Sequence, residues 1–187
     1  HSNNSLVTAM VNILLPLLAL DLSFCKIPST HTAQRVPDGN SVILVGTASL
    51  DSLNNAPFEA WYKPGIEAAK PNPDNIAALR PLLKDVEILT FLGTWCEDSK
   101  REVPKFVKIL ESAGYPVEEV RVVAMTRDKN TPQNYEEGLD ITNVPTFIFY
   151  KDGKELNRIV EFPIEDLESD MLKILRGEPY KHAYVWD

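Results

Sequence analysis

Residues 86–104 read VEILTFLGTWCEDSKREVP, and the interpretation of the fold starts from this stretch. Residues 86–92 form a continuous apolar run, which is typical of a strand covered on both faces. The apolar residues that follow recur at helical spacing, at Val103, Phe106, Val107 and Leu110. This pattern predicts an amphipathic helix over about 96–112. The stretch is therefore a buried strand that leads directly into a helix, with Cys96 at the junction.

The position of Cys96 at the first turn of that helix is the main chemical signal. Free backbone N–H groups and the positive end of the helix dipole would stabilise a thiolate there. Lys100 and Arg101 add to this effect, while the acidic side chains just before them oppose it. Ser99 lies on the same helical face as Cys96 and could donate a hydrogen bond to the sulfur. Position alone leaves two interpretations open: a reactive thiol, or a small buried core residue.

The other periodic segments indicate an α/β protein with a mixed sheet flanked by helices. Strands are predicted at 42–45, 119–125, 146–150 and 155–161, the last two joined by a turn centred on Asp152 and Gly153. Helices are predicted after Asp74, as a capping residue, and over about 164–175. Residues 47–55 have the composition of a surface loop. The aromatic segment 58–70 is interpreted as a flap packed on the core, in preference to a ligand site.

The N-terminal segment differs from the rest. Residues 6–20 are almost wholly apolar, too short to span a bilayer comfortably but suited to a secretory leader. A short buried helix is the alternative. Cys25 follows a weak lipoprotein-like box, so export to the periplasm or membrane anchoring through the N-terminus is expected, with a cytoplasmic location as the alternative. We therefore divide the chain into a leader-like segment and linker, 1–40, and a domain, 41–187, with its core over 74–187.

Composition excludes several classes of protein. The chain has 187 residues, 44% of them hydrophobic, and a formal net charge of −8. This acidic balance disfavours nucleic acid as a partner, because phosphate binding needs clustered basic residues. The two cysteines, Cys25 and Cys96, are too few for a disulfide framework or a four-cysteine zinc site. The three histidines have no metal-ligand spacing, so we expect neither a metal nor a cofactor.

Two motifs resemble the thioredoxin superfamily. Trp95, Cys96 and Pro104 match the pattern of a Trp-Cys-x-x-Cys site with a proline eight residues after the first cysteine. Residues 143–146 (NVPT), with Gly153 eight residues after the proline, are similar to the cis-proline loop of that family and the hairpin behind it. The resemblance implies a thioredoxin-like fold with an N-terminal extension. Together with the aromatic segment, the GTWC-x-DS stretch also resembles secreted thioredoxin-like proteins of Bacteroidetes.

The resemblance also implies roles for individual residues. Cys96 would be the nucleophile, Trp95 a wall beside it, and Val144, Pro145 and Thr146 a substrate platform. A cis Pro145 would lie next to the sulfur, and the backbone of Val144 would pair with an extended peptide.

Two departures from the family pattern narrow the function. Ser99 replaces the second cysteine, and Thr90 stands where the family has a buried acid. We therefore expect monothiol thiol–disulfide exchange in redox homeostasis, with Cys96 and Ser99 as the catalytic pair. The substrates would be protein or small-molecule disulfides, and an outside thiol such as glutathione would complete the reaction. The alternative is a redox-inactive module that binds peptides or proteins.

Overall fold

A computed structural model describes residues 26–187. The predicted leader over 6–20 and the predicted lipidation at Cys25 lie outside the described residues. Within the described part of the chain, no helix has the length and apolar composition needed to cross a membrane.

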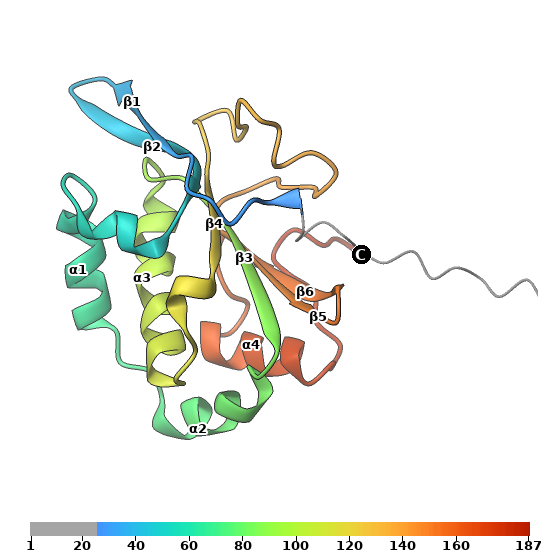
Figure 1. The fold of residues 1–187 in the computed structure, drawn as a ribbon. Coiled ribbons are helices and arrows are strands. Elements are labelled where there is room, and N and C mark those ends of the chain that lie inside the picture. The colour runs from blue at the N-terminus through green and yellow to red at the C-terminus, as the bar shows by residue number, and fades with distance from the viewer. Residues whose placement is uncertain (1–25) are drawn as a thin grey trace, which may run out of the picture.

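The described chain forms one six-stranded mixed sheet in the order β1-β2-β4-β3-β5-β6 (Figure 1). Its strands are β1 (Gln34–Asp38), β2 (Ser41–Ala48), β3 (Val86–Leu92), β4 (Arg121–Ala124), β5 (Thr146–Lys151) and β6 (Lys154–Val160). Strands β3 and β4 are parallel and the other neighbours are antiparallel. The helices are α1 (Glu59–Ala68), α2 (Pro73–Leu82), α3 (Glu97–Ser112) and α4 (Leu167–Leu175), with short 3-10 turns at Leu50–Asn54 and Val117–Glu119. The predicted α/β class is confirmed.

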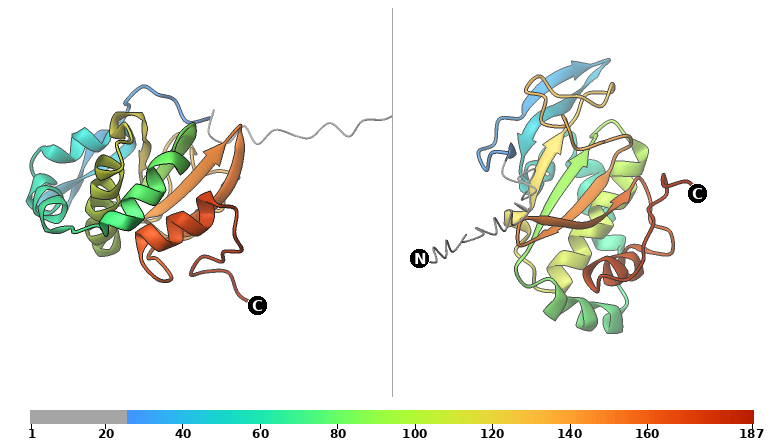
Figure 2. Two further views of the ribbon diagram at one scale, coloured as in Figure 1. Left: turned by 90° about the horizontal axis from the view of Figure 1, so that it is seen from below. Right: turned by 90° about the vertical axis from the view of Figure 1, so that its right-hand side faces the viewer.

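The two faces of the sheet are covered differently. Alternate residues of β3 enter two separate core clusters, with Ile88 and Leu92 in the larger and Leu89 and Phe91 in the smaller. The larger cluster takes the buried side chains of all four α-helices, whereas the smaller lies under the long loop between β4 and β5. Figures 1 and 2 show the helices gathered against the sheet and this loop, coloured orange, on its other side. Burial on both faces explains the uninterrupted apolar run of β3.

A strand lies where the sequence predicts a linker. Strand β1 pairs with β2 through a tight turn in which Gly39 has φ +60°. Its residues are mostly exposed, so it carries no apolar alternation from which a strand could be inferred. Ile27, further upstream, is fully buried in the smaller cluster. The packed structure therefore extends well before Ser41.

Two other local predictions need correction. Asn72, and not Asp74, caps α2, and its side-chain oxygen accepts hydrogen bonds from the N–H groups of Asp74 and Asn75 at 2.9 and 3.2 Å. Pro73 occupies the first helical position, where its missing N–H costs nothing. The predicted loop over 47–55 is the end of β2 followed by a 3-10 turn that buries its two leucines.

The aromatic segment packs on the core as predicted, and it does so as helix α1. Phe58 and Tyr62 are 2% and 3% exposed. Helix α1 lies against α3, the helix that begins next to Cys96. The approach is close, because a Cβ added at Gly65 would lie 2.6 Å from Cβ of Pro104. Gly65 therefore sets the distance between these two helices.

Replacing Gly65 tests this packing. Gly→Ala inside a helix ordinarily stabilises it by about 0.5–1 kcal/mol, but here the added methyl group meets the rigid ring of Pro104. We expect Gly65→Ala to lower the free energy of unfolding by about 1–3 kcal/mol, measured by chemical denaturation. Glu67→Ala, at an exposed site of the same helix, is the control and should change it by less than about 0.5 kcal/mol. A more stable Gly65→Ala protein would contradict this account.

Candidate functional site

Cys96 is the N-cap residue of α3. Its backbone is extended, with φ −94° and ψ 125°, and its side chain is half-buried. No side chain caps the free N–H groups of the first turn. An N-cap side chain ordinarily accepts a hydrogen bond from the second or third N–H of its helix. A thiolate at this position can accept the same bond and also interacts favourably with the helix dipole.

The charged side chains of the first turn of α3 pair with one another. Glu97 lies 3.2 Å from the Lys100 ammonium group, and Asp98 lies 2.5 Å from the guanidinium group of Arg101. Each acid that would oppose a thiolate is thus matched by a base on the same helix. The side-chain charges of the first turn are therefore largely balanced among themselves.

The predicted substrate platform lies directly beside the sulfur. The Cys96 thiol donates a hydrogen bond to the carbonyl oxygen of Val144, with Sγ and O 3.4 Å apart. The Val144–Pro145 peptide bond is cis. The Thr146 hydroxyl donates to the Asn143 carbonyl at 2.6 Å and closes the loop, and β5 begins at Thr146. Two segments almost fifty residues apart in sequence therefore meet at Cys96.

The backbone of this loop is only partly used within the protein. The Pro145 carbonyl accepts a hydrogen bond from the N–H of Glu161 at 2.7 Å. The Val144 side chain is buried in the smaller cluster. Its N–H has no hydrogen-bond partner among residues 26–187, and the residue as a whole is 3% exposed.

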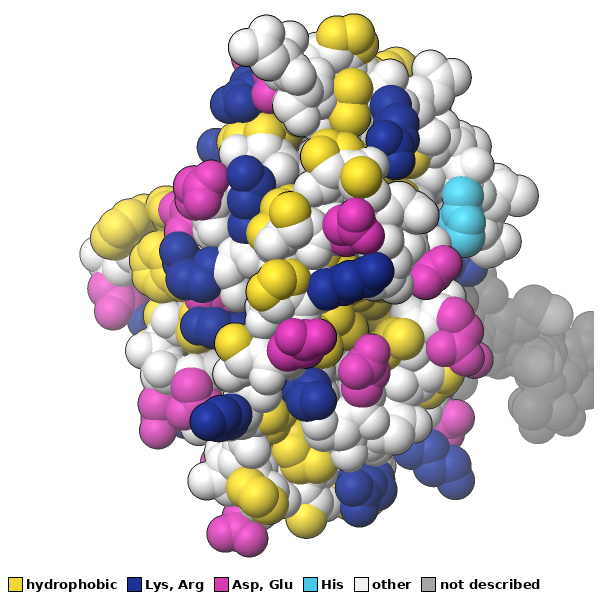
Figure 3. Space-filling model, turned by 90° about the vertical axis from the view of Figure 1, so that its left-hand side faces the viewer, with side chains coloured by type: hydrophobic (Ala, Val, Ile, Leu, Met, Phe, Trp, Pro, Cys, Tyr) yellow, Lys and Arg dark blue, Asp and Glu magenta, His cyan; other side chains and the backbone are white. Residues whose placement is uncertain are grey.

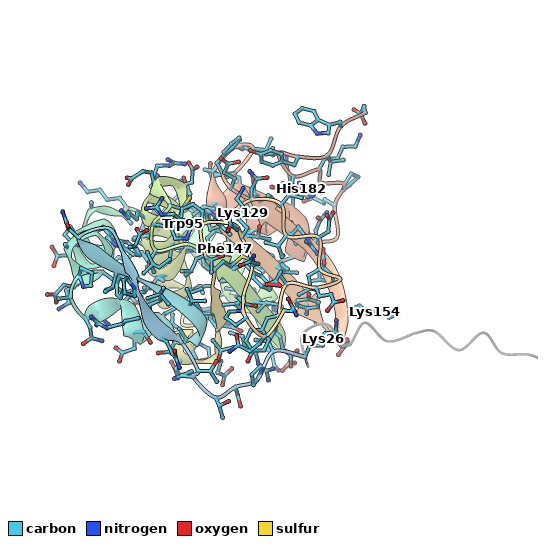
Figure 4. All side chains as sticks on the ribbon, turned by 90° about the horizontal axis from the view of Figure 1, so that it is seen from above. Lys26, Trp95, Lys129, Phe147, Lys154 and His182 are labelled. Atoms are coloured by element: carbon cyan, nitrogen blue, oxygen red, sulfur yellow. The ribbon has the colours of Figure 1, made fainter. Side chains whose placement is uncertain are left out.

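Trp95 precedes Cys96 and packs against the same smaller cluster. Its indole Nε1 donates to the carbonyl of Met125, just after β4, at 2.9 Å. The ring packs so closely on the backbone of Gly93 that a Cβ there would lie 2.6 Å from it. The guanidinium carbon of Arg127 lies 5.6 Å from the ring centre. In the view of Figure 4, Trp95 lies near Lys129, which belongs to the loop between β4 and β5.

Ser99 does not make the predicted contact with sulfur. It is fully buried, and its hydroxyl oxygen accepts a hydrogen bond from the N–H of Gly93 at 3.1 Å. The Cys96 thiol donates its hydrogen bond to the carbonyl oxygen of Val144 instead. Ser99 therefore holds the turn between β3 and α3, and its burial keeps its hydroxyl from solvent.

Thr90 occupies the core behind the site. It is 0% exposed, and its hydroxyl has no hydrogen-bond partner among the described residues. A threonine hydroxyl cannot accept a proton at neutral pH in the way that a carboxylate can.

Sequence reasoning missed three residues that shape the site. Thr94 accepts a hydrogen bond from the N–H of Leu44 at 3.2 Å and so joins the loop before Cys96 to β2. Asp38 and Arg127 form an ion pair beside Trp95. The sequence shows Asp38 in a polar stretch and Arg127 in a turn, and neither has a local signal of this contact. Within residues 26–187, no three metal-ligating side chains lie together.

The sequence of the chain resembles those of one family of known proteins. A family model described as Thioredoxin matches residues 52–171. The chain is 29% identical over 100 residues to a thioredoxin-like protein of Acanthamoeba polyphaga mimivirus, covering 54% of this chain and 70% of that protein. It is 32% identical over 88 residues to mitochondrial thioredoxin-3 of Saccharomyces cerevisiae, covering 46% of this chain and 65% of that protein.

A solved structure supports the fold. A protein of unknown function from Pseudomonas aeruginosa superposes with a TM-score of 0.53 over 69% of this chain and 92% of its own length. The two sequences are only 12% identical, so this likeness concerns the fold alone.

Removing the Ser99 hydroxyl tests its role in holding the turn. Ser99→Ala leaves the N–H of Gly93 buried without its acceptor, so we expect a loss of about 1–3 kcal/mol in the free energy of unfolding. Denaturant titration measures this loss. Ser112→Ala, in the last turn of the same helix, should change stability by less than about 0.5 kcal/mol. Equal effects of the two substitutions would show that the Ser99 hydrogen bond is not important to the fold.

Proposed function

The chain belongs to the thioredoxin superfamily, and from this premise we propose that it is a monothiol thiol–disulfide exchange protein with Cys96 as its nucleophile. The family supports a thiol–disulfide redox role in general. One observation carries the finer proposal: a half-buried cysteine at a helix N-cap, with its sulfur 3.4 Å from the carbonyl of Val144. Such a thiol lies where a helix N-terminus can act on it and has a backbone platform beside it.

The proposed reaction is exchange without net oxidation. The Cys96 thiolate attacks one sulfur of a disulfide, forms a mixed disulfide and releases the other sulfur as a thiolate. Ser99 has no sulfur with which to resolve this intermediate. An external thiolate, such as that of glutathione, then attacks the substrate sulfur of the mixed disulfide and releases Cys96. In each step one S–S bond breaks and one forms, and the external thiol leaves joined to the substrate.

The substrate class follows from the platform. The free N–H of Val144 suits an extended backbone, so a protein or peptide disulfide can form part of an added strand while its sulfur faces Cys96. Small disulfides need only reach the sulfur. On the face of the molecule that Figure 3 shows, basic and acidic side chains are interspersed.

A redox-inactive binding module is the second candidate. Two differences from the family pattern favour it. Ser99 stands in place of the resolving cysteine, and Thr90 stands in place of the buried acid. In that case the loop at Val144 would bind an extended peptide, and Cys96 would be structural. The reactivity of Cys96 separates the two candidates.

We expect Cys96 in the folded protein to react with iodoacetamide several-fold faster at neutral pH than the same cysteine does in the unfolded chain. The helix N-terminus is the physical reason. Alkylation rate against pH, followed by mass spectrometry of the peptide containing Cys96, measures it. The reference rate is that of Cys96, with Cys25 alongside, measured after the whole protein has been unfolded with denaturant. A Cys96 profile like that reference, or no labelling of the folded protein, would rule out the exchange function.

Restoring a second thiol should create dithiol chemistry. Ser99→Cys places a thiol one helical turn from Cys96, and we expect reduction of a protein disulfide by dithiothreitol to accelerate about tenfold or more, because resolution becomes intramolecular. Ser112→Cys, at the far end of α3, is the control and should give no acceleration. No gain from Ser99→Cys in a folded protein would favour the binding module.

A further inference from the structure

We propose that Asp38 and Arg127 form a positioning pair that holds Trp95 beside Cys96 and thereby favours polypeptide disulfides as substrates. The proposal rests on the exchange function proposed above. It assigns a role to the N-terminal hairpin, β1–β2, which the sequence places outside the core of the domain.

The pair has the geometry of a specific contact. Nε and Nη2 of Arg127 donate to the two carboxylate oxygens of Asp38 at 2.9 and 2.8 Å, so both oxygens are engaged. This bidentate arrangement fixes the plane of the guanidinium group as well as its position. Asp38 ends β1 and Arg127 follows β4, and the two residues are 89 positions apart. The hairpin therefore reaches over to the loop beside the site.

The fixed guanidinium group covers the indole of Trp95, with its carbon 5.6 Å from the ring centre. A cation over an indole face is attracted by the ring quadrupole. The ring is also held by the hydrogen bond to Met125 and by its contact with Gly93. Asp38 is the member of this set that keeps Arg127 over the ring, because the arginine side chain is 60% exposed and would otherwise be free to rotate into solvent.

The pair contributes little to folding. Its two side chains are 60% and 27% exposed, and ion pairs as exposed as this one contribute little to stability. The hairpin is held separately by its strand pairing along the whole of β1. The hydrogen bonds from Arg127 lower the pKa of Asp38, so the carboxylate stays charged at neutral pH. The effect of the pair should therefore appear in substrate use and not in stability.

The position of Trp95 explains why substrate size matters. Trp95 and Val144 both pack in the smaller cluster with Cys96, and the carbonyl oxygen of Val144 lies 3.4 Å from the sulfur. A polypeptide whose backbone pairs with Val144 must pass this indole, whereas a small disulfide needs only the sulfur. In Figure 4 Trp95 lies between the β1–β2 hairpin and the C-terminal segment that carries His182. A displaced indole would obstruct the longer substrate selectively.

The test compares two substrates in wild type and Asp38→Asn. The rate constant of Cys96 is measured with disulfide-bonded insulin and with neutral 2,2′-dithiodipyridine. We expect Asp38→Asn to lower the insulin rate about three- to tenfold and to change the dithiodipyridine rate by less than about twofold. Asp38→Glu should recover most of the insulin rate. The melting temperature should not change, and Glu59→Gln, which breaks an exposed ion pair on α1, should affect neither rate.

The dependence of the insulin rate on salt concentration is a second measurement. This rate would not depend on salt in this way if the Asp38–Arg127 pair had only a structural role. At about 1 M salt the Debye length is about 3 Å, so the exposed pair is weakened. The insulin rate of wild type should fall toward that of Asp38→Asn, whose own rate should change little.

The outcomes separate the two proposals. If wild-type Cys96 reacts with neither disulfide, the exchange function is wrong and the positioning role falls with it. If Cys96 reacts with both, and Asp38→Asn changes neither rate or both alike, only the positioning role is overturned. A lowered melting temperature for Asp38→Asn would also overturn it.

Discussion

Burial of β3 on both faces is the constraint on which the rest of the structure depends. One set of its side chains packs under the helices and the other under the loop between β4 and β5, so the strand is central to the sheet. Its neighbours, β4 and β5, are held on either side by this ladder. Because β3 leads directly into α3, the position of Cys96 follows from the position of the strand.

The same arrangement brings both parts of the site together. Strand β5 begins beside the end of β3, which places Val144 and Pro145 next to the sulfur. Strand β4 runs parallel to β3 and ends at the same edge, which places the carbonyl of Met125 within hydrogen-bond distance of the indole nitrogen of Trp95. Parallel neighbours bring the residues at their carboxyl ends together, and ligand sites in α/β proteins commonly lie at that edge.

The polar groups around Cys96 are arranged to hold the loop, not to resolve a mixed disulfide. The hydroxyl of Ser99 is engaged by the N–H of Gly93 and is shut away from solvent. Thr90 lies in the core with no group that could take a proton at neutral pH. A nucleophile with no internal partner fits exchange with outside thiols, and it makes substrate positioning at Trp95 and Val144 more important to the rate.

The sequence by itself determined the strand and helix around Cys96, the position of the thiol at the helix N-terminus and the β5–β6 hairpin, because periodicity, capping and turn chemistry act over a few residues. Only the tertiary structure decided that 34–38 form a strand, that Ser99 bonds to Gly93, and that Asp38 meets Arg127 over Trp95. These contacts depend on where the sheet brings distant segments together. Exposed polar side chains carry no periodic signal of their partners, so their pairing follows from the assembled fold.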